Sequence, residues 1–445
     1  MRKGLCDFKY LISDVRILIL VVVTLILSSC GEKPRDENGK TTLILYHWME
    51  RDRDLWQEKV IAPFEKAHPN IAVRLESAPY GLYVSKVMTS IASGAKVADL
   101  MFAEDWFGQE LIHRSYARNL MPMARRDLAL DDFYQDAFQE WRGVAQKPDE
   151  LFGFPAAVGL TVLFYNKDPF DAAGIPYPDT TWTYDDLVRV GKQLTIDRDS
   201  DGVPEQWGLT FDVQYTGLET VVYSLGGRML TPDLSRAVYT EPATLAAFSF
   251  IRDLFQKDRI ASFSTSIITP WEPFLSRKAA MNLIGSHGSM DLVGSGMRWD
   301  LTMPPKGKDG RRLSRRFSMA FMIPQNSDHP DEAWELLKWI LTRSPAESVD
   351  RQYLGMMPTY WPVVRSRAWL ESAPRYNRQI IVDLAEHYAL PLYTPGWQEW
   401  RDKILTPDLM TFIRGGMTVE EFAQDAEERI NAVLERTLEE SRPGP

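Results

Sequence analysis

Apolar and polar positions along the first third of the chain switch between the periods of strands and helices. Residues 43–48 and 97–102 are short apolar runs, and residues 71–76 alternate apolar with polar side chains, which predicts three strands. Residues 54–67 and 83–93 repeat apolar side chains every three to four positions, which predicts a helix before the second strand and another before the third. Strands that alternate with helices predict a parallel sheet with helices on its faces.

Local signals place the ends of several helices. Pro63 is expected to kink or restart the first helix, and Gly94 to end the second. Thr183 is placed to cap a later helix, and Thr418 with Glu421 forms a capping-box pattern ahead of a final amphipathic helix. Helical periods also cover residues 241–256 and 331–341.

The N-terminal segment has the layout of a secretory signal. Basic residues precede an apolar run at 17–27, which is shorter than the roughly 20 residues of a membrane-spanning helix. The residues Leu27-Ser28-Ser29 before Cys30 resemble a bacterial lipobox, in which the cysteine becomes the lipidated N-terminus. We expect a lipoprotein signal peptide over 1–29, then the lipidated Cys30 and a flexible tether over 30–41. The alternative is an ordinary signal with an incidental cysteine.

Length and charge narrow the class of protein. A chain of 445 residues is too long for one compact core, so two or three domains are expected. The net charge of −10 argues against nucleic-acid binding, which needs clustered lysine and arginine. One basic cluster, at 306–316, is expected to be a solvated hairpin rather than a phosphate site. The sequence has no motif for a zinc site, a nucleotide-binding loop or a serine-hydrolase elbow, and no cofactor is expected.

An acidic segment spaces oxygen ligands as a calcium loop does. Asp197, Asp199 and Asp201 precede Gly202 at the place of the sharp turn, with Glu205 beyond it. The glutamate expected at the twelfth position is replaced by Gly208. A calcium loop and a solvated acidic turn both remain open, and no metal site is assigned.

Two pairs of residues lie just beyond the carboxyl ends of predicted strands. Open α/β sheets bind their ligands at these strand ends. Glu104 and Asp105 follow the third strand, and their carboxylates either accept hydrogen bonds from sugar hydroxyls or cap the next helix. His47 and Trp48 follow the first strand. The Trp48 ring either stacks on a sugar or packs in the core.

The segment 152–194 decides between these alternatives through a resemblance. It carries Gly-x-Pro, an apolar strand that ends in Tyr-Asn-Lys-Asp, then Ala-Gly-x-x-x-Pro and Thr-Trp before a helix. This order of motifs closely resembles that of the bacterial extracellular solute-binding protein family 1. Members of that family serve ATP-driven sugar importers and include maltose-binding protein. Further matches occur in order over about residues 42–435. The matching residues are Gly153, Pro155, 165–168, Ala173, Gly174, Pro178, Thr181 and Trp182, with 64–70, 93–99, Gly226, Gly227 and 274–281 elsewhere.

The resemblance implies an α/β, two-lobed periplasmic-binding-protein fold of the class II type. Its ligand cleft lies between lobes joined by a hinge that the chain crosses more than once, near 155–159, 317–321 and 356–359. We therefore expect lobe 1 to comprise 42–155 and 320–357, and lobe 2 to comprise 156–319 and 358–440. The ligand is expected to contact both lobes and to stabilise the closed state.

The resemblance also implies a set of ligand-binding residues. In relatives a tryptophan commonly follows the Gly-x at 285–286, and His287 replaces it here, which suggests a smaller or differently held sugar. Trp400 is an alternative to Trp397 as the C-terminal stacking residue. The expected ligand-binding residues are Trp48, Arg51, Asp105, Trp106, Tyr215, Ser286, His287 and Trp397.

The function that follows is capture of a sugar or oligosaccharide for an ABC importer, without catalysis. Expected partners are a small carbohydrate, the permease subunits and the membrane, through the N-terminal lipid, and the protein is expected to be an exported monomer facing the periplasm or the cell exterior. One alternative is a protein of the same fold that binds a polyol, glycerol phosphate or a peptide. The other is an exported carbohydrate-active enzyme using Glu104 and Asp105, although adjacent residues do not easily flank a glycosidic bond at the required separation of roughly 5–9 Å.

Overall fold

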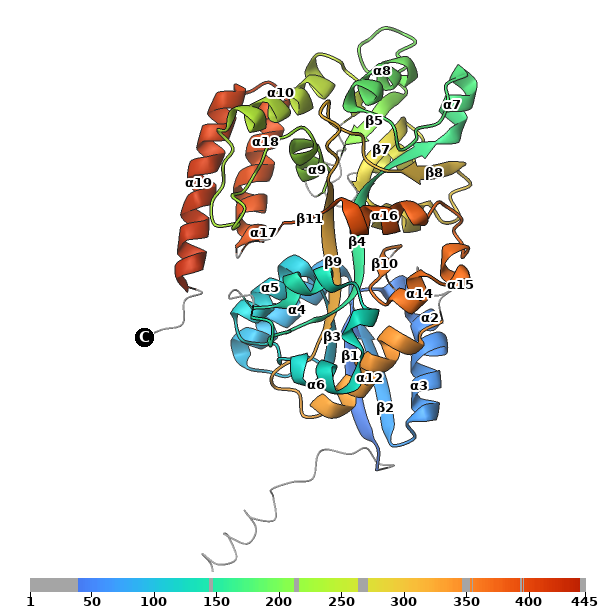
Figure 1. Cartoon of the computed structure of the whole chain (residues 1–445), viewed down its shortest axis with the longest axis vertical. Helices are drawn as coiled ribbons and strands as arrows, with labels where there is room; N and C mark the ends of the chain where they lie inside the picture. Colours follow the sequence, from blue (N-terminus) through green and yellow to red (C-terminus); the bar gives the residue numbers. More distant parts are fainter. Residues whose placement is uncertain are drawn as a thin grey trace, which may run out of the picture.

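The computed structural model describes residues 39–143, 147–211, 216–262, 271–345, 353, 355–392, 394 and 396–440. Two α/β lobes are stacked along the long axis of the molecule, and extended strands run from one into the other (Figure 1). Lobe 1 denotes the half that holds the first three strands, and lobe 2 the half that holds the C-terminal helix. The two-lobed α/β fold is confirmed. In the described part of the chain, no helix has the length and apolar character to cross a membrane.

The sheet of lobe 1 begins with three parallel strands, as the alternation of strand and helix predicts. Strand β1 (Thr41–His47) lies between β2 (Ile71–Ser77) and β3 (Leu100–Glu104) and is parallel to both. Strand β3 starts at Leu100 and not at residue 97 as expected, because the side chain of Asp99, rather than a backbone carbonyl, is the acceptor beside β1. Its carboxylate accepts a hydrogen bond from the Ile44 amide at 3.0 Å. The delay leaves Glu104 as the last residue of the strand.

The first helical segment is continuous, and Pro63 does not break it. Helix α2 (Arg53–Trp56) leads into one π turn, η2 (Gln57–Ile61), and then into α3 (Ala62–Ala67), which carries Pro63 in its first turn. The wider π turn removes the need for the proline nitrogen to donate to the preceding turn. Helix α4 (Tyr80–Ser93) ends as predicted at Gly94, whose φ of 70° favours glycine.

Strand β4 (Phe154–Asn166) connects the two lobes, and every one of its residues is buried. Its first half pairs antiparallel with β9 (Ser314–Met322) and with β10 (Met357–Pro358). Its second half pairs antiparallel with β7 (Ala279–Gly285) and β8 (Trp299–Thr302). Three segments distant in sequence therefore run side by side where the lobes meet.

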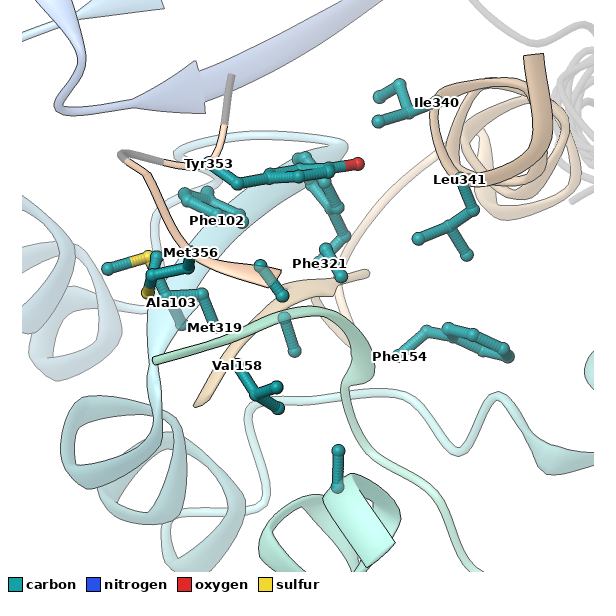
Figure 2. Packing of buried hydrophobic residues seen from close by; sticks show 14 of the residues in the cluster. Phe102, Ala103, Phe154, Val158, Met319, Phe321, Ile340, Leu341, Tyr353 and Met356 are labelled. Carbon is teal, nitrogen blue, oxygen red and sulfur yellow. The ribbon is translucent and has the colours of Figure 1, made fainter. Parts of the chain in front are cut away.

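Buried apolar side chains form two clusters. The first includes side chains from β1, β3, β9, α12 (Pro330–Arg343) and α16 (Gln379–His387). Figure 2 shows part of it, where Phe102 of β3 and Phe321 of β9 pack with ring centroids 4.7 Å apart. The second cluster includes side chains from α8 (Tyr184–Leu194), α10 (Pro242–Gln256) and the C-terminal helix α19 (Val419–Glu440).

Capping confirms two of the predicted helix starts. The Thr183 hydroxyl accepts a hydrogen bond from the Asp186 amide, and the Asp186 carboxylate accepts one from the Thr183 amide, at the start of α8. Thr418 and Glu421 make the same reciprocal pair before α19. The other elements are η1 (Glu50–Asp52), α5 (Asp105–His113), α6 (Met121–Asp127), η3 (Leu130–Asp132), η4 (Gln135–Trp141), α7 (Lys167–Ala173), β5 (Trp207–Phe211), α9 (Gly217–Ser224), β6 (Ala261–Ser262), α11 (Glu272–Leu275), η5 (Ser286–Leu292), α14 (Trp361–Val364), α15 (Arg367–Leu370), β11 (Ala389–Pro391), α17 (Trp397–Trp400), η7 (Arg401–Leu405) and α18 (Thr406–Ile413).

The arginine-rich segment is only in part the solvated hairpin that its composition suggests. Lys308 and Arg311 are exposed, but the prediction was wrong for the three arginines that follow. Arg312, Arg315 and Arg316 are only 4%, 3% and 1% exposed. These three arginines lie at or just before the start of β9, which passes between the lobes, so their side chains are enclosed from both sides. Arg312 donates to the carbonyl oxygens of Pro304 and Thr180, each at 2.6 Å, which replaces the lost contact with water.

Candidate functional site

The carboxyl ends of the lobe 1 strands carry a group of aromatic side chains. Trp48, which follows β1, is half-buried and stacks on Phe102 with centroids 5.1 Å apart. It also makes edge contacts with Tyr80 at 5.4 Å and with Tyr83 at 5.3 Å. The Trp48 ring thus packs against the core and also forms part of an aromatic surface at the sheet edge.

Glu104 belongs to the same surface, and it does not cap the next helix. It occupies the N-cap position of α5, but its side chain makes no capping hydrogen bond. Instead its Oε2 accepts hydrogen bonds from the Tyr80 hydroxyl and from Trp106 Nε1, both at 2.8 Å. Burial raises the pKa of Glu104, and these two hydrogen bonds oppose that shift.

Asp105 points in another direction, toward the strand that joins the lobes. One carboxylate oxygen accepts from the Ser318 amide at 3.0 Å and the other from the Trp106 amide at 2.7 Å. Burial raises the pKa of Asp105, and the charge of Arg315 works against the rise. The side chain is 4% exposed and ties the start of α5 to β9.

Lobe 2 contributes a tryptophan and an arginine near the start of α17. Trp397 is 8% exposed, and the Arg401 guanidinium carbon lies 4.1 Å from the centroid of its ring. Trp400 is 2% exposed, and its Nε1 donates to the Thr394 hydroxyl at 3.0 Å. Trp400 is therefore fixed by packing and by this hydrogen bond, whereas Trp397, although also buried, is the more exposed of the two.

Ser286 and His287 lie at the end of β7, beside the strand junction. His287 makes edge contacts with Trp271 at 5.4 Å and with Phe317 at 5.5 Å, and burial lowers its pKa to about 4. The imidazole is therefore neutral near pH 7. The Ser286 hydroxyl is buried and makes no hydrogen bond with the described residues.

Trp106 contacts both lobes. Its half-buried ring packs against both apolar clusters, so it contacts lobe 1 and lobe 2 at once. Burial raises the pKa of both Glu104 and Tyr80, and the charge of Arg401, from lobe 2, is a smaller influence that opposes the rise. Trp48 and Trp106 thus belong to one region, because both make ring contacts with Tyr80. Trp397 is a member of the second cluster, against which Trp106 packs. No ring contact or hydrogen bond among the described residues links Ser286 or His287 to that region.

Some expected residues cannot be placed. Cys30, the segment 1–29 and Tyr215 lie outside the described residues, and so does the side chain of Arg51, whose backbone belongs to η1. Tyr80 and Arg401 were not expected at the site. Tyr80 follows the carboxyl end of β2, so the rule that singled out Trp48 applies to it as well. Arg401 is four residues after Trp397, which places both on one helix face.

The acidic turn gathers three carboxylates, as its spacing suggests. Ligand atoms of Asp197, Asp199 and Asp201 all lie within 4.8 Å of one another. They also accept hydrogen bonds from backbone amides of the turn, including the bond from Gly202 to Asp197 at 3.1 Å. At Gly208 a Cβ would lie 2.2 Å from the Gly191 carbonyl oxygen, so no larger residue fits there. The calcium loop and the acidic turn both remain open.

Two surface hollows on lobe 2 lie away from these residues. One of about 430 Å³ lies between α8 and α10, and one of about 560 Å³ is bordered by Lys167, Val293, Arg298 and Arg375. Neither is lined by an expected ligand-binding residue. The region around Trp106 therefore remains the candidate site.

The sequence model of the bacterial extracellular solute-binding proteins matches residues 50–347. The chain belongs to this family. A Brucella abortus (strain 2308) relative described as a binding protein is 23% identical over 398 residues, covering 85% of this chain and 90% of the relative. The galactooligosaccharide-binding protein of Bacillus subtilis is 26% identical over 310 residues, covering 67% of this chain and 68% of its own length.

Solved structures of other solute-binding proteins share the fold. An ABC substrate-binding protein of Listeria monocytogenes, in complex with cycloalternan, has a TM-score of 0.77 and 19% identity, and the match covers 89% of this chain and 99% of that one. A Mycobacterium tuberculosis protein in complex with glycerophosphocholine also has a TM-score of 0.77, with 15% identity and coverage of 90% and 100%. At these identities the likeness establishes the two-lobed architecture alone.

Proposed function

We propose that this chain is the extracytoplasmic carbohydrate-binding component of an ABC importer. The observation that carries the proposal is the position of Trp106, which packs against both apolar clusters and donates a hydrogen bond to Glu104. Aromatic faces and carboxylates are the groups that bind the apolar faces and the hydroxyls of sugars. Relatives that bind galactooligosaccharides and arabinooligosaccharides support the same ligand class.

Ligand capture would close the lobes on the sugar. Strands β4 and β9 and the short β10 are the proposed hinge, with 42–155 and 320–357 as lobe 1 and 156–319 and 358–440 as lobe 2. A micromolar affinity corresponds to about −8 kcal/mol, which a few aromatic faces and hydroxyl hydrogen bonds can supply. The permease would then recognise the closed form. The proposed ligand-binding set remains Trp48, Arg51, Asp105, Trp106, Tyr215, Ser286, His287 and Trp397.

The proposed anchor is a lipid on Cys30, with the polar segment that follows it as a tether. The family is one of exported binding proteins rather than enzymes. We infer a monomer that faces the periplasm or the cell exterior and works beside its permease. Mass spectrometry of the mature N-terminus tests the anchor, and an uncleaved Met1 would contradict it.

A thermal-shift panel on protein lacking residues 1–30 tests the ligand class. Sugars, polyols and sugar phosphates are each added in excess, and a true ligand stabilises the folded state by RT ln(1 + [L]/Kd). We expect oligosaccharides to raise the melting temperature. If only a sugar phosphate or a polyol does so, the protein is a transporter component for that solute. If the glycan is consumed during the assay, the protein is an enzyme.

A further inference from the structure

Two neighbouring arginines at the start of β9, Arg315 and Arg316, bond to opposite lobes, and we call them the arginine pair. Their side chains leave opposite faces of the strand, because successive side chains of a strand alternate. The Arg315 amide donates to the Thr220 hydroxyl of α9 at 3.0 Å, and its Nη2 donates to the Leu392 carbonyl oxygen at 2.7 Å. Leu392 and the buried apolar side chains of α9 belong to the second cluster, so Arg315 is bonded to lobe 2.

Arg316 is bonded to lobe 1. Its Nε donates to Glu140 Oε1 at 2.8 Å, its Nη2 to the Asp136 carbonyl oxygen at 2.9 Å and its Nη1 to the Tyr134 hydroxyl at 3.2 Å. These partners lie on η4 or directly before it, among residues of the first cluster. Both charges of the Arg316–Glu140 pair are buried, so separating them would leave each without a partner. We therefore expect Arg316 to move together with lobe 1.

The residues on either side of the arginine pair repeat this division. Before it, the Ser314 hydroxyl donates to the Thr161 carbonyl oxygen at 2.8 Å, and Thr161 pairs with β7 of lobe 2. After it, the Ser318 amide donates to the Asp105 carboxylate at 3.0 Å, and the Ser318 hydroxyl accepts from Trp141 Nε1 at 2.9 Å. Asp105 begins α5 and Trp141 ends η4, both in lobe 1. The attachment of β9 therefore changes from lobe 2 to lobe 1 within the arginine pair.

The strands beside β9 change partner at the same level. Strand β4 pairs with β9 up to Leu160, which lies opposite Arg316, and pairs with β7 from Thr161 onward. Strand β11, which leads to Leu392 of the second cluster, pairs with β9 up to Pro391, which also lies opposite Arg316. A rotation of one lobe against the other disturbs the fewest hydrogen bonds at this level, because the bonds on each side of it stay within one lobe.

We propose that Arg315 and Arg316 are positioning residues of the hinge, each fixing β9 to one lobe, and that the lobes turn about the paired residues Leu160 and Arg316. This inference rests on the proposed function and deepens it, because it names the residues that set the orientation of the lobes. In this role neither arginine touches the sugar. A loosened attachment lets the free protein adopt a wider range of lobe orientations, and binding must then order the lobes at a cost in affinity.

Arg315→Met tests this role, and Arg312→Met is its matched control. Methionine keeps the apolar stem of arginine and removes the guanidinium. Arg312 is buried in the same segment, but its acceptors, the carbonyl oxygens of Pro304 and Thr180, both lie within the proposed lobe 2. Both variants lose buried hydrogen bonds and should be less stable to denaturant. Only Arg315→Met should change the arrangement of the lobes.

Double electron–electron resonance between two spin labels measures that arrangement. Protein lacking residues 1–30 contains no cysteine, so Ser85→Cys on α4 and Gln424→Cys on α19 place one label on an exposed site of each lobe. In the free protein we expect Arg315→Met to broaden the distribution of distances and Arg312→Met to leave it unchanged. Arg315→Lys keeps a donor for the Leu392 carbonyl oxygen and should restore part of the narrow distribution. A loss of stability alone does not move this readout.

Isothermal titration with a galactooligosaccharide and an arabinooligosaccharide measures the cost in affinity. We expect Arg315→Met to bind the sugar that wild type binds about three- to tenfold more weakly. Arg312→Met should bind it with unchanged affinity. Thr220→Val removes the acceptor of the Arg315 amide and keeps the shape of the side chain. It should broaden the distances in the same direction, and it carries the test if Arg315→Met does not fold.

The distances in the free protein and the sugar titrations can fail independently. An unchanged distribution in both Arg315→Met and Thr220→Val overturns the role of the arginine pair, whether or not a sugar binds. Equal broadening in Arg312→Met also overturns it, because the effect would then follow the loss of any buried arginine. If the distances change as expected but wild type binds neither oligosaccharide, the proposed function fails and the assignment of the hinge residues stands.

Discussion

Arg316 on β9 and Glu140 in η4 form an ion pair with a nitrogen–oxygen distance of 2.6 Å, and their side chains are 1% and 0% exposed. Glu140→Gln would leave the Arg316 charge buried without its counter-charge. We expect the free energy of unfolding to fall by about 3–5 kcal/mol, measured by denaturant titration. Glu110→Gln, which breaks an exposed pair, is the control and should cost less than about 1 kcal/mol. Equal losses in the two variants would mean that the buried pair has no special role.

Phe317 and Gly159 are paired residues of the antiparallel strands β9 and β4. A Cβ on Gly159 would lie 2.0 Å from a carbon of the Phe317 ring, so Gly159→Ala forces the ring to move. Overpacking of this kind costs about 1–3 kcal/mol of stability. In a double-mutant cycle with Phe317→Leu, the smaller side chain should relieve part of the cost. Strict additivity of the two changes would show that the ring has another way to relax.

Trp397 and Trp400 are one helical turn apart and should respond differently to truncation. Trp400→Ala removes a buried ring and its hydrogen bond to Thr394, so a loss of about 3–5 kcal/mol in stability is expected with little change in sugar affinity of the folded protein. Trp397→Ala should lower the sugar affinity at least about tenfold. Calorimetric titration and thermal melts on both variants separate the two effects. An unchanged affinity in Trp397→Ala would remove it from the site.

His47 makes stability depend on pH. Burial lowers its pKa from 6.5 to about 4, with the nearby Arg53 as a second cause, and its Nδ1 accepts from the Met49 amide at 2.8 Å. Between pH 4 and 6.5 the unfolded chain binds this proton and the folded chain does not, so stability falls as the pH falls through that range. From pH 7 to 4.5 the loss from His47 is about 2–3 kcal/mol.

His47→Asn isolates this contribution, because the asparagine oxygen can accept from the Met49 amide and does not titrate. Free energies of unfolding at pH 7 and pH 4.5 are compared for the two proteins. We expect the wild type to lose more stability than the variant by that amount. An identical pH dependence would mean that His47 is protonated in the folded state.

The local features of the fold could be read from the sequence, but the long-range ones could not. Gly94, Thr183 and Thr418 act on neighbouring residues, so their roles as helix ends followed from residue type alone. The burial of Arg316 could not be foreseen in this way, because its partner Glu140 is 176 residues earlier in the chain. Residue type suggested a solvated segment, and tertiary pairing reversed that prediction.

The same distinction applies to the candidate site. Trp48 and Asp105 could be singled out because they follow strands, where open α/β sheets bind ligands. The similar solved structures share the two-lobed fold to which that rule applies. The state of Glu104 depends on Tyr80, 24 residues earlier, and on the rotamer of Trp106. Its sequence position suggested only a cap or a ligand contact. The hydrogen bonds show that it is not a cap.

Strand β4 belongs to both lobes, with β9 and β10 beside its first half and β7 and β8 beside its second. Unfolding either lobe alone would strip hydrogen bonds from the end of a strand that the other lobe still holds. The two lobes are therefore expected to unfold in one cooperative transition, and neither is an independent folding unit. The backbone amides in the middle of β4 should be the slowest in the chain to exchange with solvent, whether the cleft is open or closed.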